Sequence, residues 1–242
     1  MKVILIPCLK DNYCYVAQIN AGKSVLNILV DAPDFHAIDD YFTQNNLQLD
    51  FILSTHHHGD HVDGNLELKN KYNCKIYGSY EDADRIPGID FKLKPEETFK
   101  IGNTMIETHY VPGHTHHHIV YYIHEGLALF SGDTLFSMGC GKLFEGTYAE
   151  MYKSLQKIKA LPNETKIYCG HEYSEKNAQF ALSVDDGDNA PLKKRYQEVL
   201  KLRSENRPTV PTTLALEKEI NPFLRASSVD EFKKLRQLRD NF

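Results

Sequence analysis

The densest group of potentially reactive side chains lies in residues 55–61, Thr-His-His-His-Gly-Asp-His, directly after an apolar run at 51–54. Neutral imidazoles must be desolvated and hydrogen-bonded when they are buried, so this crowding is unfavourable for folding by itself. Imidazole nitrogen and carboxylate oxygen are ligands that Zn²⁺ and similar cations prefer. The stretch therefore predicts a metal site. Its internal position and interrupted spacing argue against the alternatives, a solvated polar loop or a purification tag.

Three later segments repeat the pattern of an apolar, strand-like run that ends in a His or Asp. They are residues 110–114, 129–133 and 167–171, which end in His114, Asp133 and His171. A glycine directly precedes each of these three polar residues and permits a sharp turn. Side chains at the ends of separate strands converge on one edge of a sheet, where a rigid scaffold holds them. Together with His56, the three segments predict one composite site.

The elements that would position these residues alternate between strand and helix over the first 190 residues. Strands are expected at 2–8, 13–19, 25–31, 50–55, 74–78, 97–101, 104–111, 117–124, 127–130 and 166–169. Helices are expected at 34–45, 62–72, 148–161 and 174–184. The remainder is patterned as two helices, 191–206 and 229–240, with a Pro-containing linker at 207–212 and no strand. The pattern indicates an α/β body followed by a helical C-terminal part.

Composition limits the functional classes. The 242 residues carry a net charge of −5, which argues against a general nucleic-acid binder. From residue 191 onward there are 12 Lys and Arg against 7 Asp and Glu, whereas residues 1–190 hold 16 against 26. The acidic body suits a cation site, and the basic C-terminal part suits an anionic small molecule.

Other sequence features bear on the compartment. No apolar run approaches the roughly 18 residues that a membrane span needs, and the start of the chain lacks the features of a signal peptide. The five cysteines form no CxxC pair, so free, buried thiols are expected. We therefore expect a cytoplasmic protein with no membrane or nucleic-acid partner.

The pattern HxHxDH followed by separate His, Asp and His positions resembles the metallo-β-lactamase superfamily. The resemblance implies a four-layer αβ/βα sandwich over residues 1–174, with an α-helical substrate-binding domain at 175–242. It implies two divalent cations. The first would be held by His56, His58 and His114, the second by Asp60, His61 and His171, and Asp133 would bridge them.

The resemblance also implies the chemistry. A hydroxide shared by the two metals would be the nucleophile, with Asp60 and Asp133 as the carboxylates of the catalytic centre. Zn²⁺ suits the mixed nitrogen and oxygen ligands, and iron or manganese fit the same set. Among the remaining histidines, His118 is the candidate for a hydrogen bond to a metal ligand. His57 is expected to lie outside the ligand set.

Four further segments narrow the resemblance to the hydroxyacylglutathione hydrolase (glyoxalase II) family: Gly-Cys-Gly-Lys-Leu-Phe-Glu-Gly at 139–146, Gly-His-Glu-Tyr at 170–173, and the C-terminal stretches 221–225 and 235–242. This resemblance implies hydrolysis of S-D-lactoylglutathione, and of related 2-hydroxyacyl thioesters, to a hydroxy acid and glutathione. That reaction is the second step of methylglyoxal detoxification.

Substrate contacts follow from the same resemblance. The candidates are Lys142, Phe144, His171, Tyr173, Arg236 and Arg239. Arg236 and Arg239 are three apart in a helical pattern and share a face that can bind carboxylates; a solvated helix face is the alternative reading. Many family members carry Tyr where this chain has Phe144, which removes one hydroxyl and one hydrogen bond.

Other functional classes remain open at this point. A mononuclear iron persulfide dioxygenase also uses glutathione-derived substrates, but the complete second set of ligands argues against it. Another hydrolase of the same fold and a non-catalytic metal-binding protein are further alternatives. We expect a monomer.

Overall fold

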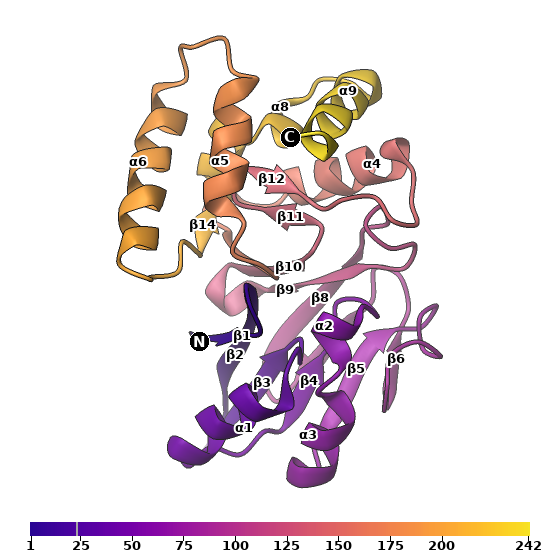
Figure 1. Cartoon of the computed structure of the whole chain (residues 1–242). Helices are drawn as coiled ribbons and strands as arrows, with labels where there is room; N and C mark the ends of the chain where they lie inside the picture. The colour runs from indigo at the N-terminus through magenta and orange to yellow at the C-terminus, as the bar shows by residue number, and fades with distance from the viewer. Residues whose placement is uncertain (23) are drawn as a thin grey trace. The chain divides into compact units, whose positions relative to one another are not determined.

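The computed structural model describes residues 1–22 and 24–242 and divides into two compact units. The first unit comprises residues 1–110 and 117–132, and the second comprises residues 111–116 and 133–242 (Figure 1). The chain therefore passes into the second unit for six residues, returns, and leaves the first unit for good after residue 132.

The first unit contains a six-stranded sheet in the order β1-β2-β3-β4-β5-β6. Its strands are β1 Lys2–Cys8, β2 Asn12–Ala21, β3 Ser24–Val30, β4 Phe51–Leu53, β5 Lys75–Ser79 and β6 Phe91–Leu93. The pairs β1–β2 and β2–β3 are antiparallel, and β3 to β6 run parallel. Parallel strands end at the same edge of the sheet, so the loops after β3, β4 and β5 lie at one edge.

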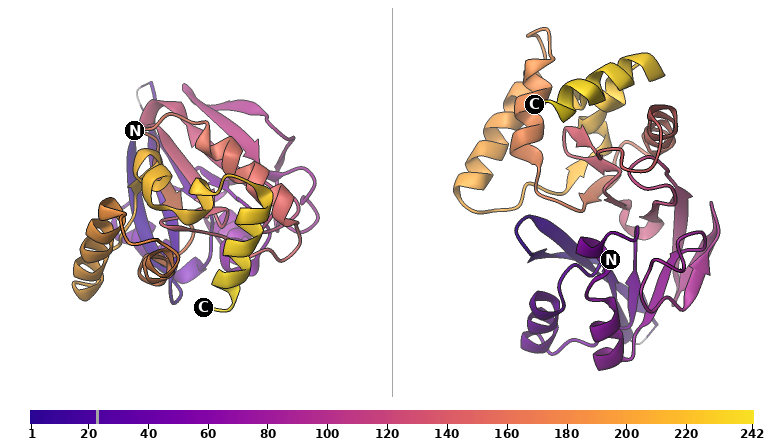
Figure 2. Two further views of the ribbon diagram at one scale, coloured as in Figure 1. Left: turned by 90° about the horizontal axis from the view of Figure 1, so that it is seen from above. Right: turned by 45° about the vertical axis from the view of Figure 1, so that its right-hand side comes forward.

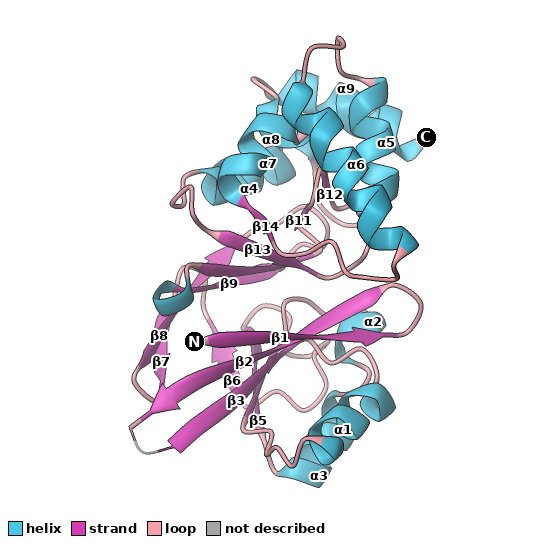
Figure 3. Cartoon of the chain, turned by 90° about the vertical axis from the view of Figure 1, so that its left-hand side faces the viewer, coloured by secondary structure: helices cyan, strands magenta, loops and turns pink. Residues whose placement is uncertain are grey.

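Three helices connect these strands: α1 Phe35–Gln44, α2 Gly59–Val62 and α3 Asn65–Tyr72. Asp34 caps α1 by accepting a hydrogen bond from the backbone N–H of His36 at 3.0 Å. The apolar face of α1, with Ile38 and Phe42, packs with Leu68 of α3 against the sheet. Figure 3 shows α1 and α3 together on the same face of the sheet.

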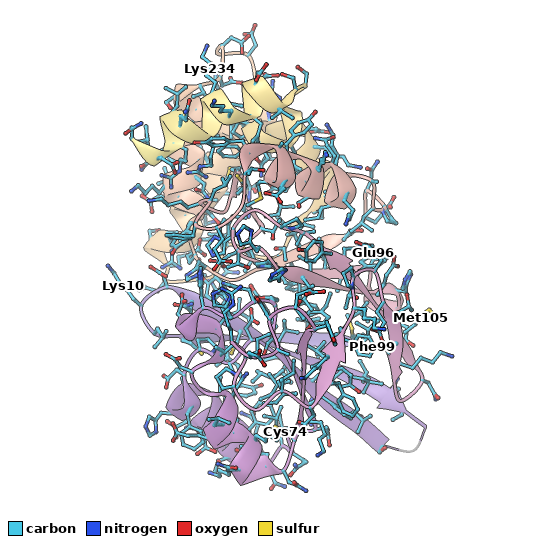
Figure 4. All side chains as sticks on the ribbon, turned by 90° about the vertical axis from the view of Figure 1, so that its right-hand side faces the viewer. Lys10, Cys74, Glu96, Phe99, Met105 and Lys234 are labelled. Atoms are coloured by element: carbon cyan, nitrogen blue, oxygen red, sulfur yellow. The ribbon has the colours of Figure 1, made fainter. Side chains whose placement is uncertain are left out.

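A second sheet of the first unit is built from consecutive antiparallel strands, β7 Thr98–Ile101, β8 Thr104–Tyr110, β9 Ile119–Ile123 and β10 Ala128–Gly132. A 3₁₀ turn, η1 His124–Gly126, joins β9 to β10. The ring of Phe99 stacks on that of Tyr77 at 4.8 Å between centroids, which shows that the two sheets pack against each other. Met105 of β8 points away from the ribbon (Figure 4).

The second unit is mostly helical. Its strands are β11 Leu135–Phe136, β12 Gly139–Cys140, β13 Lys166–Cys169 and β14 Thr212–Thr213. Its helices are α4 Tyr148–Lys159, α5 Ser174–Ser183, α6 Ala190–Ser204, α7 Leu214–Ile220, α8 Pro222–Arg225 and α9 Val229–Asp240. α5 and α6 lie side by side (Figure 2). Their core residues Ala178, Leu192 and Val199 pack with Ile220 of α7.

The structure confirms most of the predicted elements. The expectation of no strand after residue 190 is wrong, because β14 pairs antiparallel with β13. The helix expected at 62–72 begins at Asn65, and α2 precedes it as a separate turn. β6, β11, β12, α7 and α8 have no counterpart in the prediction, since segments of two to seven residues show little periodicity.

Two expectations drawn from composition can also be compared with the structure. All five cysteines are free and buried, as expected. Within residues 1–22 and 24–242, no helix has the length and apolar character needed to cross a membrane. The boundary expected between residues 174 and 175 stays a prediction.

A buried hydrogen bond joins the two sheets of the first unit. The hydroxyl of Tyr121 on β9 donates to the carbonyl oxygen of Ser54 at 2.9 Å, just before the His-rich turn. We expect Tyr121→Phe to lower the free energy of unfolding by about 1–2 kcal/mol, because the carbonyl loses its donor. Chemical denaturation measures the change, and Tyr122→Phe, on the opposite face of β9, is the matched control. Equal losses in both variants would contradict the assigned role.

Candidate metal centre and substrate pocket

The His-rich stretch forms the turn between β4 and α2. β4 ends at Leu53, and α2 begins at Gly59 with His58 at its N-cap position. The ring of His56 lies 4.7 Å from that of His58 and 4.2 Å from that of His61, between centroids. The first unit therefore gathers three of the predicted ligands, and Asp60 lies in the same helical turn.

Asp31, the residue after β3, orients two of these histidines. One carboxylate oxygen, Oδ2, lies 2.8 Å from Nδ1 of His61 and accepts a hydrogen bond from the Thr55 hydroxyl at 2.9 Å. The other oxygen accepts the backbone N–H of Thr55 at 2.8 Å. The Thr55 oxygen in turn lies 3.0 Å from Nδ1 of His56. Because Thr55 donates its proton to Asp31, the Nδ1–H of His56 donates to Thr55.

Asp60 is held by Asn12 at the start of β2. The Asn12 amide donates to the Asp60 backbone carbonyl at 2.9 Å and to its carboxylate Oδ2 at 3.1 Å. The same carboxylate oxygen lies 3.8 Å from Nε2 of His61. Asn12 therefore fixes the direction in which the Asp60 carboxylate points.

The second unit brings together the other three predicted ligands. One carboxylate oxygen of Asp133 lies 3.5 Å from Nε2 of His114 and 3.3 Å from Nε2 of His171. Nδ1 of His114 lies 2.8 Å from the backbone carbonyl of Lys142 and donates to it. A side chain at Gly141 would collide with the Asp133 carbonyl, so glycine is required for this approach.

This arrangement fits metal binding at both groups of donors. In His56, His61 and His114 the Nδ1 nitrogen already donates to an oxygen, so the tautomer leaves Nε2 with its lone pair. All three imidazoles are buried. Buried imidazoles that donate through Nδ1, together with nearby carboxylates, are the donor set of divalent transition-metal sites. Both units therefore contribute donors suited to a divalent cation.

Two neighbouring histidines have other partners. The buried ring of His118 stacks on that of His56 at 4.7 Å and 21°, which limits how His56 can rotate. A side chain at Gly132 would come within 2.8 Å of His118, and its φ of +46° also favours glycine. His57 interacts with Asp82 at 3.1 Å and with Arg85. The hydrogen bond expected from His118 to a metal ligand stays a prediction.

A pocket of about 210 Å³ lies in the second unit. It brings together four of the predicted substrate residues with other side chains of the hairpin β11–β12, α5 and α9. The lining residues are Phe136, Cys140, Lys142, Tyr173, Asn177, Arg236, Arg239 and Asp240. Three of these side chains are cations, so the pocket suits an anionic ligand.

The two arginines on α9 are only partly neutralised. Arg236 is buried and donates to the Cys140 carbonyl at 2.8 Å and to Asp240 at 3.0 Å. Its Nε–H is buried and has no partner within the described residues 1–22 and 24–242. Burial, and next the charge of Arg236, lower the pKa of Arg239, which donates to Asn177 at 3.2 Å. A carboxylate in the pocket would relieve the cost of keeping both charges.

Aromatic side chains form the rest of the wall. The ring of Tyr173 stacks on the ligand candidate His171 at 4.7 Å and 4°, and Phe136 lies 5.3 Å from the Tyr173 ring. Phe144 is not among the lining residues and is 62% exposed. Its ring meets that of His114 edge-on at 5.2 Å, with Lys142 Nζ 5.6 Å from the ring centroid. The Tyr173 contact thus links the pocket to the metal donors of the same unit.

Two family models match the chain, and together they account for most of it. Residues 27–171 match the metallo-β-lactamase superfamily, and residues 172–242 match the C-terminus of hydroxyacylglutathione hydrolase. A hydroxyacylglutathione hydrolase of Pelagibacter ubique is 44% identical over 242 residues and covers 100% of both chains. The chain belongs to the hydroxyacylglutathione hydrolase family. A relative of the same name from Brucella ovis is 46% identical over 218 residues, which are 90% of this chain and 84% of that one.

Two solved structures are similar to this chain in fold. ETHE1 from Myxococcus xanthus has a TM-score of 0.72 at 22% identity and covers 98% of this chain and 90% of its own. The BLEG-1 B3 metallo-β-lactamase has a TM-score of 0.70 at 21% identity, over 93% and 100%. The predicted αβ/βα sandwich fold with a helical C-terminal region is confirmed.

The sequence reasoning missed three residues that orient the site: Asn12, Asp31 and Asn177. A signal for Asp31 was present, because it follows the apolar strand β3 as His56 follows β4. Asn12 and Asn177 act through contacts with residues 48 and 62 positions away, which no local pattern predicts.

The role of Asp31 can be tested through metal affinity. We expect Asp31→Asn to weaken metal binding roughly 10–100-fold, because the variant no longer fixes the tautomer of His61 through a carboxylate. Competition with a chromogenic chelator measures the affinity. Asp40→Asn, at an exposed position of α1, is the matched control. Wild-type affinity in Asp31→Asn would show that these hydrogen bonds do not support metal binding.

Proposed function

We propose that the protein hydrolyses the thioester of S-D-lactoylglutathione, and of related 2-hydroxyacylglutathiones, to a 2-hydroxy acid and glutathione. The observation that carries the proposal is the 44% identity to a hydroxyacylglutathione hydrolase over the whole length of both chains. The cationic pocket of the second unit adds chemical support, because glutathione carries two carboxylates and the pocket offers three cations.

For the metal centre we propose two divalent cations, bound by the seven side chains named from the sequence. His56, His58 and His114 would hold one ion, and Asp60, His61 and His171 the other, with Asp133 shared by both. When bound, such ions supply a nucleophile by lowering the pKa of coordinated water, and they polarise the acyl carbonyl. Zn²⁺ suits these ligands, and iron or manganese remain open.

The chain's own residues have distinct tasks in this scheme. Asp31 and the Lys142 carbonyl fix the orientation of His61 and His114. Asp133 serves as a ligand rather than as a proton carrier. The hydrogen bond from the Asn12 amide fixes the orientation of the Asp60 carboxylate. Preorganised ligands of this kind need no rearrangement during the reaction, which is the main contribution a protein scaffold can make.

Substrate binding falls to the pocket. Arg236, Arg239 and Lys142 would bind the carboxylates of glutathione, and the Tyr173 hydroxyl would bond its peptide backbone. His171 contacts both the substrate pocket and the proposed metal ligands, because its ring stacks on Tyr173 and its Nε2 lies close to Asp133. Phe144 lacks a hydroxyl, so we expect weaker glutathione binding by about 0.5–1.5 kcal/mol than with Tyr at this position.

The alternative of a mononuclear iron persulfide dioxygenase is not favoured, because relatives that match 90–100% of this chain are named hydroxyacylglutathione hydrolase. Two further expectations, a monomeric state and a cytoplasmic location, stay predictions. Size-exclusion chromatography with light scattering would test the first.

A thioesterase assay combined with metal analysis tests the proposed function. We expect metal-loaded protein to release glutathione from S-D-lactoylglutathione with two metal ions per chain. Asp133→Asn should lose metal and turnover together, because the amide replaces the shared carboxylate. Release of no glutathione by fully loaded wild-type protein would refute the proposal. Full metal content and activity in Asp133→Asn would reject the assignment of Asp133.

Arg239 provides a separate test of the pocket. Arg239→Ala should mainly raise KM, by about tenfold, because it removes binding energy that is present before the reaction. Steady-state kinetics separates KM from kcat. Arg207→Ala removes an exposed arginine that pairs with Glu205 and serves as control. A fall in kcat at constant KM would place Arg239 in the chemical step instead.

A further inference from the structure

A tight turn between β11 and β12 forms part of the pocket wall. The residues on its two sides, Phe136 and Cys140, both line the pocket. Met138, within the turn, has a φ of +56° and is fully buried. A residue with a Cβ rarely adopts this left-handed backbone conformation, so contacts with the surrounding structure must hold Met138 in it.

The buried carboxylate of Glu217, on α7, holds one side of this turn. Its Oε2 accepts the backbone N–H of Met138 at 2.7 Å, and its Oε1 accepts the Ser137 hydroxyl at 3.1 Å. The hydroxyl of Thr212 and the amide of Asn221 complete its partners, at 2.8 and 3.0 Å. Burying a carboxylate is costly unless donors compensate it, so this set of four is a specific arrangement.

Asn221, the residue after α7, holds the other side. Its amide nitrogen donates to the carbonyls of Phe136 at 3.2 Å and Gly139 at 3.0 Å, as well as to Glu217. Its own carbonyl oxygen caps α8 by accepting the N–H of Phe223 at 3.0 Å. Glu217 and Asn221 thus bind the backbone at Phe136, Met138 and Gly139 and the side-chain hydroxyl of Ser137, so each residue of 136–139 is held.

We propose that Glu217 and Asn221 are positioning residues for substrate: by fixing the turn at 136–139 they set the shape of the pocket that binds the glutathione part. The proposal rests on the proposed function for the identity of the substrate. Neither residue lines the pocket. They act through Phe136, which packs on Tyr173, and through the Cys140 carbonyl, which accepts from Arg236.

The turn also connects α7 and the residue that follows it to the pocket, which is lined by residues of α5 and α9. Asn177 of α5 donates to the Ser137 carbonyl at 3.2 Å and accepts from Arg239. Movement of the turn would therefore displace both arginines, one through Cys140 and the other through Asn177. This predicts an effect on substrate affinity rather than on the chemical step.

Glu217→Gln and Glu217→Leu together separate the loss of the negative charge from the loss of the hydrogen bonds. A glutamine can place its carbonyl oxygen toward Met138 and Asn221, the two obligatory donors, and its NH₂ toward hydroxyls that can rotate to accept. Leucine has a similar size and accepts nothing. Val199→Ala, in the apolar core formed with Ile220, is the control for lost stability without loss of the hydrogen bonds.

Three measurements are made on each full-length, metal-loaded variant: KM and kcat for S-D-lactoylglutathione, the inhibition constant of glutathione, and hydrogen exchange at the Met138 amide. We expect Glu217→Leu to raise KM and the inhibition constant by about tenfold, with kcat changed less than threefold and faster exchange. Glu217→Gln should remain close to wild type.

The opposite results would overturn the proposal. They are an unchanged KM and inhibition constant in Glu217→Leu, or the same values in Glu217→Leu and Val199→Ala. A tenfold effect in Glu217→Gln would also contradict it, because charge rather than the hydrogen bonds would then be responsible. If wild-type protein leaves the thioester intact, the proposed function fails, whereas glutathione binding and Met138 exchange still decide the role of Glu217.

Discussion

The hydrogen bonds of Asp31 are the constraint on which the metal centre depends. One carboxylate fixes the Nδ1 nitrogen of His61 directly and that of His56 through the Thr55 hydroxyl. A neutral imidazole can carry its lone pair on Nδ1 or on Nε2, but an imidazole that donates through Nδ1 carries it on Nε2. The fold supplies this carboxylate by ending β3 beside β4, so the sheet itself determines which nitrogens can bind a cation.

A different electrostatic constraint governs the pocket of the second unit, where the positive charge of two neighbouring arginines is compensated only in part and is therefore costly. Arg236 and Arg239 lie close enough for one to lower the pKa of the other, and Asp240 compensates only in part. We expect the carboxylates of the proposed substrate to offset this positive charge, with the hairpin held by Glu217 and Asn221 keeping the shape of the pocket.

The sequence predicts the strands that come before His56, His114, Asp133 and His171, because an apolar run precedes each of these residues. The complete set of seven metal ligands follows from the family resemblance and stays a prediction. It fails where a residue acts across the chain. Glu217 reads as an ordinary charged residue of a short helix, yet it is fully buried and contacts residues about 80 positions away. Asn177 and Asn12 are similar cases. The two-residue strands β11, β12 and β14 have no periodicity to detect, although the first two shape the pocket.

The most direct test is a crystal structure of the metal-loaded protein with anomalous data at the metal absorption edge. We expect two peaks per chain, with Nε2 of His56, His61 and His114 at about 2.0–2.2 Å from a metal and each Nδ1 still bonded to its oxygen partner. A single peak, or coordination through Nδ1 with Asp31 displaced, would contradict it.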